Sequence, residues 1–334
     1  MMSKKSKDSR NNVPKNKVRK HNLEYFDNSN FETKDINEVT SLLLDTYKTY
    51  NGRRFLNDDN LNCLLPSDKI ELERSTLSHL LLRHRWKGNF CSPIKEKLNT
   101  RGTTILDVGC GPGLWTIDMG LKYPSSSIIA IDIDSSNFPP SDQHPQNVCF
   151  LTCNAIDGIP FPQNTFDFVN ISMMWSVFSE AQWILVIKEL VRVLKHDGWI
   201  EFTEPDPMVK NRGKKLTWLM EHFSKACQEI RDVNVHIHEK IPNYIKEMDE
   251  LKDLTCMSVD YPLGEWYGCF GDYAIKNFKR VFQGLVFLPK YMEMSNEEFN
   301  GLLNGCFEEA NKNKSFFTIY KCFAKKASGE VSII

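Results

Sequence analysis

The order of apolar and polar positions predicts alternating strands and helices between residues 100 and 206. Short apolar runs typical of strands are TTILDVG, SSIIAIDID, VCFLTCNA, TFDFVNISMM and GWIEFTEPD. LWTIDMGLKYP after the first run predicts a helix stopped by Pro124, and 179–198 predicts a helix with a Ser179/Gln182 capping box, ended by His196-Asp197-Gly198. Strands that are apolar on both faces and alternate with helices indicate an α/β fold with a covered parallel sheet.

The flanking regions follow a different pattern, which predicts additions to one domain rather than a second domain. Before the strands, apolar spacing predicts helices over 34–50 and over 67–87, the second with Ser67 as N-cap. After residue 206 we predict helices over 214–232, 239–253 and 296–312, a strand at 255–263, a terminal strand at 315–326 and a helical cap insertion at about 264–312.

Charge along the chain is uneven although the net charge is only −1. Residues 1–20 hold eight Lys or Arg and one Asp, so the rest of the chain carries a net charge of −8. An acidic body argues against nucleic acid as a partner, while the basic tail is too polar to fold alone. It is a solvated tail, a nuclear-import signal or a phosphate-docking segment, so we expect a cytoplasmic or nuclear protein. No apolar stretch is long enough for a membrane span, and the ten cysteines carry no CxxC pair.

The segment from Asp107 to Gly113 (DVGCGPG) places three glycines directly after the first predicted strand. Glycines let backbone approach a ligand closely, and the start of the next helix offers free N–H groups. The third glycine comes one residue too early for the dinucleotide fingerprint G-x-G-x-x-G, and no Gly-Lys-Ser/Thr follows for a phosphate loop. The loop therefore predicts a small-molecule site of another kind.

With its Asp, the loop reads D-x-G-x-G-x-G and resembles that of the class I, Rossmann-like S-adenosylmethionine-dependent methyltransferases. This resemblance implies a seven-stranded, mostly parallel sheet with helices on both faces, and S-adenosylmethionine as cofactor. It implies that Asp132 accepts from the ribose hydroxyls, in preference to Asp134, and that Ile133 lies against the adenine. Asn154-Ala155 stands where relatives carry an acidic residue and Ala, and Asp167 is expected to order the start of the fourth strand. The predicted cofactor-binding residues are Asp107, Gly109, Cys110, Gly111, Gly113, Asp132, Ile133, Asn154, Ala155 and Ser172.

The resemblance covers about residues 66–326 and is greatest to the fungal regulatory methyltransferases linked to secondary metabolism. It divides the chain into a disordered basic tail (1–30), an N-terminal helical segment covering the cofactor site (31–100) and a methyltransferase domain (101–330). The implied activity is methyl transfer to a small-molecule or protein acceptor by in-line displacement. The alternative is a cofactor-binding regulatory protein with little or no turnover and a protein partner.

Candidates for the acceptor side follow the fourth and fifth strands, although no catalytic residue is assigned. Met173, Met174 and Trp175 line a pocket or pack in the core, and Asp206 is a base or a turn residue. Glu204 belongs to the same group. Three cationic residues precede the first predicted strand: Arg83, Arg85 and Lys87. They either reach the carboxylate of the cofactor or lie at an exposed helix end. The pair His236 and His238 lacks a third ligand nearby, so we expect no metal.

Overall fold

The computed structural model describes residues 46–57 and 63–329, and these form one α/β unit. Within them, seven strands form a single sheet in the order β5-β4-β3-β6-β7-β9-β8. The strands are β3 (Thr104–Val108), β4 (Ser127–Asp132), β5 (Val148–Thr152), β6 (Phe166–Ser172), β7 (Leu194–Lys210), β8 (Leu251–Pro262) and β9 (Phe316–Lys326). Neighbours pair in parallel except β9, which is antiparallel to both β7 and β8. The predicted seven-stranded, mostly parallel sheet is confirmed.

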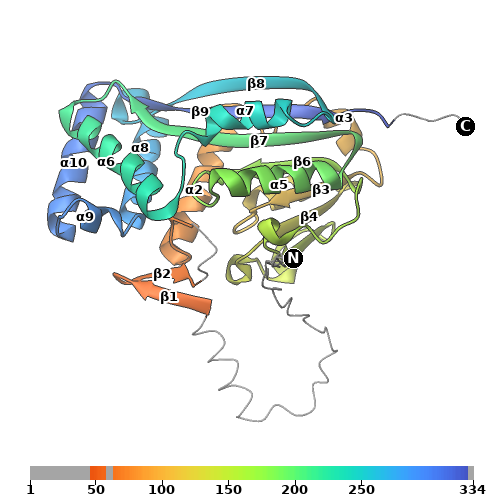
Figure 1. The fold of residues 1–334 in the computed structure, drawn as a ribbon, viewed down its shortest axis with the longest axis horizontal. Helices are drawn as coiled ribbons and strands as arrows, with labels where there is room; N and C mark the ends of the chain where they lie inside the picture. Colours follow the sequence, from red (N-terminus) through yellow and green to blue (C-terminus); the bar gives the residue numbers. More distant parts are fainter. Residues whose placement is uncertain (1–45, 58–62, 330–334) are drawn as a thin grey trace, which may run out of the picture. The chain divides into compact units, whose positions relative to one another are not determined.

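Helices cover both faces of the sheet and continue beyond one end of its long strands. The α-helices are α2 (Lys69–Trp86), α3 (Lys95–Leu98), α4 (Leu114–Lys122), α5 (Glu180–Val193), α6 (Lys214–Arg231), α7 (Ile237–Lys246), α8 (Gly268–Gly284), α9 (Leu288–Tyr291) and α10 (Asn296–Lys312). Short 3₁₀ turns are η1 (Ser135–Asn137), η2 (Ser141–Gln143), η3 (Ala155–Asp157) and η4 (Glu265–Tyr267). Figure 1 shows α5 and α7 in front of the central strands and α6, α8, α9 and α10 gathered beyond one end of β7 and β9.

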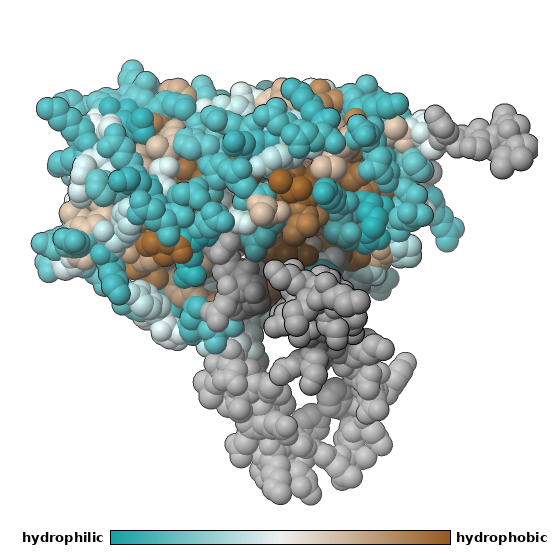
Figure 2. Space-filling model, viewed as in Figure 1, coloured by the Kyte–Doolittle hydropathy of each residue, from teal (hydrophilic) through white to brown (hydrophobic). Residues whose placement is uncertain are grey.

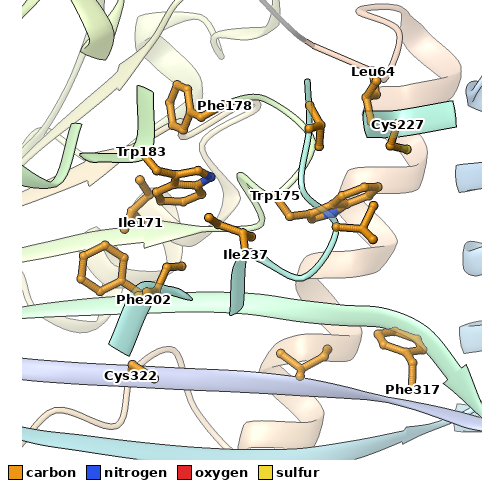
Figure 3. Close-up of a cluster of buried hydrophobic side chains, with 14 of the residues drawn as sticks. Leu64, Ile171, Trp175, Phe178, Trp183, Phe202, Cys227, Ile237, Phe317 and Cys322 are labelled. Atoms are coloured by element: carbon orange, nitrogen blue, oxygen red, sulfur yellow. The ribbon is translucent and has the colours of Figure 1, made fainter. Parts of the chain in front are cut away.

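Two apolar layers form because successive residues of a strand face opposite sides of the sheet. Ile105 of β3 and Phe168 of β6 pack toward α3 and α4, whereas Leu106 of β3 packs in the larger layer under α5. That larger layer includes Trp183, whose ring lies edge-on to Phe178 at 5.2 Å. Figure 3 shows these two rings close to Ile171 and above Phe202 of β7. Hydrophilic residues cover most of the face seen in Figure 2.

Several local predictions are confirmed by the structure. The Ser179/Gln182 capping box begins α5, α10 has the predicted bounds, and β8 and β9 lie where strands were expected. Asp167 accepts from the Thr104 N–H at 2.9 Å and so ties β6 to the start of β3. Burial acts to raise the pKa of Asp167, but hydrogen bonds from Lys195 and Lys97 outweigh it and lower the pKa to about 2.

Four local predictions are wrong at their ends. The predicted helix 34–50 ends in strand β1 (Tyr47–Tyr50), which pairs with β2 (Arg53–Leu56), while 34–45 lie outside the described residues. Asp68, not Ser67, caps α2, because its side chain accepts from the Glu71 N–H. The helix after Ser179 ends at Val193, since residues 194–198 already belong to β7. The helix predicted over 239–253 ends at Lys246, because residues from Leu251 pair with β9.

The basic tail (1–30) also lies outside the described residues, so its predicted disorder stays a prediction. Among the residues that the structure does describe, no helix is long and apolar enough to cross a membrane.

A buried ion pair joins the sheet to the segment before β3. Glu201 of β7 accepts from Lys321 of β9 at 2.7 Å and from the N–H groups of Cys91 and Ser92, both at 2.8 Å. Both charged side chains are almost completely buried. Because Glu201 satisfies one cation and two amides at once, it fixes residues 91–92 against the sheet.

We predict that Glu201→Ala lowers the free energy of unfolding by about 3–5 kcal/mol, because the buried Lys321 ammonium loses its partner. Urea denaturation of the variant and the parent protein measures this difference. Asp272→Ala, which removes an exposed pair with Lys276 on α8, is the matched control and changes stability by less than about 1 kcal/mol. A similar small loss in both variants would contradict the role of Glu201.

Candidate functional site

A cavity of about 310 Å³, called here the main cavity, lies at the carboxyl ends of β3, β4 and β6. In open α/β sheets this edge is where ligands bind. The loop after β3 and the end of β4 form one wall, and α2 with the residues following it forms another. Seven of the ten predicted cofactor-binding residues line it: Asp107, Gly109, Cys110, Gly111, Asp132, Ile133 and Ser172.

The glycine loop takes a shape that side chains resist. Gly109, Gly111 and Gly113 all have positive φ, at +68°, +52° and +72°. A Cβ on Gly109 would collide with Met174, and one on Gly113 with Phe150, so these two glycines serve close packing. Space beside Gly111 is open, and this residue lines the main cavity. The backbone at Gly111 is therefore the part of the loop that a ligand can approach most closely.

Asp132 joins the loop to the end of β4. Its Oδ2 accepts from the Gly111 N–H at 2.8 Å and its Oδ1 from the Asp134 N–H at 2.9 Å. Burial raises the pKa of Asp132, although these N–H groups oppose that effect. Each carboxylate oxygen keeps a second lone pair for a hydroxyl donor from the cavity.

Asp134 has a structural role. It accepts from Tyr47 of β1 at 2.6 Å and from the hydroxyl of Ser67, just before α2. Burial acts to raise the pKa of Asp134, but the hydrogen bonds from Ser67 and Tyr47 outweigh it and lower the pKa. Asp134 thus holds the β1–β2 hairpin and the start of α2 beside the main cavity.

Asp107 lies at the base of the loop. It accepts from Thr116 at 2.5 Å and from Asn170 at 2.8 Å. Burial, together with the neighbouring Asp132 carboxylate, raises the pKa of Asp107 to about 6 against the effect of these two hydrogen bonds. A cation in the main cavity would favour the ionised form of this carboxyl group.

Three predicted cofactor-binding residues do not line the main cavity in the described structure. Gly113 caps α4, and Ala155 is buried in η3. The Asn154 side chain accepts from the Ile156 N–H at 3.2 Å and donates to Asp157 at 3.0 Å. Contact between these three residues and a cofactor stays a prediction.

The residues expected on the methyl-acceptor side differ in whether they line the main cavity. Met173 and Met174 line the main cavity, and Met173 has φ +61°, a conformation uncommon for a non-glycine residue. Glu204 lines no described cavity but accepts from the Met174 N–H at 2.8 Å and the Trp175 N–H at 2.9 Å. Glu204 therefore positions the turn that carries Met173.

Asp206 lies within β7 opposite Thr318 of β9, so the expectation of a turn at this residue is wrong. Its side chain accepts from the Met208 N–H and pairs with Lys210. His238 lies inside α7 and its ring stacks on Tyr320. Because His236 is the N-cap of the same helix, the two rings do not share a strand face.

Residues before β3 contribute more to the main cavity than their sequence indicated. Arg83 lines it and pairs with Asp118 of α4 at 2.7 Å, whereas Arg85 donates to the Asp260 carbonyl and Lys87 caps α2. His79 of α2 also lines it and contacts the same Asp118 at 2.8 Å. Sequence analysis missed Lys321 as well, although one lysine within the apolar run TIYKCFA was a usable signal.

Comparison with known proteins identifies the domain. A family described as "Methyltransferase domain" matches residues 105–198. N-methyltransferase verN of Clonostachys rogersoniana is 27% identical over 173 residues, which cover 50% of this chain and 58% of that protein. The secondary metabolism regulator laeA of Aspergillus niger is 26% identical over 209 residues, covering 61% and 53% of the two chains. This chain thus spans less than two thirds of the length of these relatives.

Among solved structures, phosphoethanolamine N-methyltransferase 2 of Haemonchus contortus in complex with S-adenosyl-L-methionine aligns with a TM-score of 0.47 at 16% identity, covering 88% of this chain and 74% of that one. The sheet order and the glycine loop agree with a class I, Rossmann-like methyltransferase fold, and residues 105–198 match a methyltransferase domain. The chain's similarity in sequence to verN and laeA places its relatives among fungal proteins.

We predict that Glu204 makes stability depend on pH between about 4.5 and 8. Burial raises the pKa of Glu204 from 4.5 to about 8, although the two N–H groups that it accepts from act to lower it. Its stabilising effect is therefore full below about pH 4.5 and is lost as the pH rises through 8. Urea denaturation should show wild type losing roughly 2 kcal/mol between pH 6 and 8 relative to Glu204→Gln, which cannot ionise. The exposed Glu239→Gln is the control, and equal pH dependence in all three proteins would be the contrary result.

We also predict that Gly111→Ala weakens cofactor binding. Its methyl group would enter the main cavity, and crowding of about 1–3 kcal/mol corresponds to an increase of about 5- to 160-fold in the Kd for S-adenosylhomocysteine. Gly102→Ala is the matched control, because Gly102 also has positive φ and open space but lies away from the cavity. Calorimetric titration of both variants measures the effect; equal Kd values would show that the cofactor does not pass Gly111.

Proposed function

We propose that this protein transfers a methyl group from S-adenosylmethionine to an acceptor molecule. One observation carries the proposal: a single cavity joins the glycine loop after β3 to Asp132 at the end of β4. Named methyltransferases among the relatives, such as verN and pytC of Aspergillus terreus, support the same activity.

The residues present fit S-adenosylmethionine. The Asp132 carboxylate suits a ribose, whose two hydroxyls need acceptors, and Ile133 beside it offers an apolar surface for adenine. Open space at Gly111 lets the cofactor pass close to the protein backbone. The Asp107 carboxylate favours a positively charged part of the cofactor nearby. When bound, S-adenosylmethionine supplies an electrophilic methyl carbon on a sulfonium sulfur.

The chain's own residues contribute orientation and exclusion of water, which suffice when the acceptor carries its own nucleophile. Asp132 and the loop fix one end of the cofactor, while α2 covers the cavity through Ser75, His79 and Leu82. Glu204 accepts from the N–H groups of Met174 and Trp175 and so positions the turn that carries Met173, which lines the main cavity. We assign no general base.

The acceptor is a small molecule or a protein side chain, and we expect nucleic acid to be excluded by the acidic body of the chain. The regulatory alternative, a cofactor-binding protein with little or no turnover that acts through a protein partner, is supported by similarity to proteins named as secondary metabolism regulators. Action in the cytoplasm or nucleus is likewise a proposal, supported by the basic segment 1–20.

We predict that Asp132→Asn raises the Kd for S-adenosylmethionine by about 10- to 100-fold, since the amide has one acceptor oxygen where the carboxylate has two and carries no charge. Isothermal titration calorimetry of the full chain provides the measurement. Asp142→Asn is the control, because the exposed Asp142 lies in η2 outside the main cavity, and the Kd of this variant should stay within about twofold.

Absence of binding by the intact protein would overturn the proposed function. Where binding is found, formation of S-adenosylhomocysteine with a panel of acceptors separates the two alternatives. Turnover identifies a methyltransferase, and tight binding without turnover on any acceptor supports the regulatory protein.

A further inference from the structure

A second, smaller cavity of about 50 Å³ adjoins the main cavity and is called here the aromatic cavity. The two cavities share Arg74, Ser78 and Leu82 of α2 and Met173 after β6. Apart from Trp175, its remaining wall comes from elements outside the matched family region, chiefly α6, α8 and β9. A molecule that reached it from the main cavity would pass Met173, the residue that Glu204 positions.

Six of the sixteen residues that line it are aromatic. Side chains from five elements or turns meet there: Trp175, Phe223, Tyr261, Phe278, Phe282 and Phe317. Figure 3 shows Trp175 beside the pale orange ribbon of α2 and Phe317 on β9, in agreement with this lining. Such walls favour a flat apolar group, which gains from edge-to-face contacts as well as from burial.

One buried polar group in the aromatic cavity lacks a partner. Asn277 of α8 is 7% exposed and donates through Nδ2 to the Ser78 hydroxyl at 2.7 Å. Its Oδ1 is buried and accepts no hydrogen bond from any residue that the structure describes. A buried carbonyl oxygen without a donor costs free energy, so a ligand that supplies an O–H or N–H would recover that free energy.

The charges around the aromatic cavity are balanced. Arg74 donates to Glu71 at 2.7 Å through Nε, its Nη2 lies 2.7 Å from the same Glu71 oxygen, and its Nη1 donates to Ser78 at 2.8 Å. Because the guanidinium is already paired, an anionic ligand would find no free cation there. A neutral ligand suits this site.

We propose that the methyl acceptor is a neutral small molecule that places a flat apolar group in the aromatic cavity and donates an O–H or N–H to Asn277 Oδ1. The proposal rests on the proposed function, since it concerns the acceptor for that reaction. A dry cavity of about 150 Å³ holds a benzene molecule, so about 50 Å³ admits the edge of a single ring while the rest of the acceptor lies toward Met173. Insertion of a folded protein surface does not fit this geometry.

The test compares four probes of similar shape on the full chain saturated with S-adenosylhomocysteine, by ligand-observed NMR titration. Phenol and aniline carry a donor, toluene carries none, and benzoate is charged. We expect phenol and aniline to bind about tenfold more tightly than toluene, the effect of one hydrogen bond, and benzoate to bind most weakly.

Two variants assign the preference to this cavity. Asn277→Leu keeps the side-chain size but removes the acceptor, so phenol and toluene should then bind equally. Ala274→Leu, one turn earlier on α8, fills the cavity and should weaken phenol and toluene alike. The control Asn300→Leu changes an exposed asparagine of α10 and should leave the tenfold preference intact.

Binding of S-adenosylhomocysteine in the same samples shows whether each variant is folded. If the intact protein binds it but does not prefer phenol to toluene, or prefers benzoate, this inference fails and the proposed function stands. An unchanged preference in Asn277→Leu with retained cofactor binding overturns the inference too. No binding of S-adenosylhomocysteine by the intact protein overturns the proposed function and this inference with it.

Discussion

The Asp132 carboxylate holds together the parts from which the main cavity is built. One oxygen accepts from Gly111 in the loop after β3 and the other from Asp134 beyond β4. Asp134 in turn accepts from Tyr47 and Ser67, which fixes the hairpin and the start of α2. Loop shape and helix position thus depend on one partly buried side chain, whose burial costs free energy that these N–H donors offset.

Two glutamates of β7 extend this arrangement across the sheet. Glu201 fixes residues 91–92 and pairs with Lys321, while Glu204 accepts from the amides of Met174 and Trp175. They are three residues apart, so the pleat directs them to opposite faces of the sheet, and each anchors a different irregular segment. Irregular backbone near a ligand needs such acceptors, because it has no ladder partners of its own.

The sequence predicted the parallel sheet and most of the main cavity because both depend on local patterns. Runs such as TILDV and SIIAID are apolar on both faces, and the loop DVGCGPG carries its own conformational requirement in its glycines. Tyr47 was misassigned to a helix because apolar spacing alone does not reveal the hydrogen bond from its hydroxyl to Asp134, which is 87 residues away. His79 and Lys321 were missed for the same reason, since tertiary contacts bring them to the cavity.

The proposed recognition of the methyl acceptor is the property that local sequence patterns predict least well. The aromatic cavity combines α2 before the sheet, α8 in the cap insertion and β9 near the end of the described chain. Each contributing residue looks like ordinary core when considered in its own helix or strand, and Asn277 stands out only because its Oδ1 faces no donor among the described residues. The predicted cofactor-binding residues lie on consecutive βα units, so their spacing is constrained by the fold, whereas residues 264–312 contribute no strand to the sheet. In this architecture, substrate choice can therefore diverge while the loop and Asp132 stay the same.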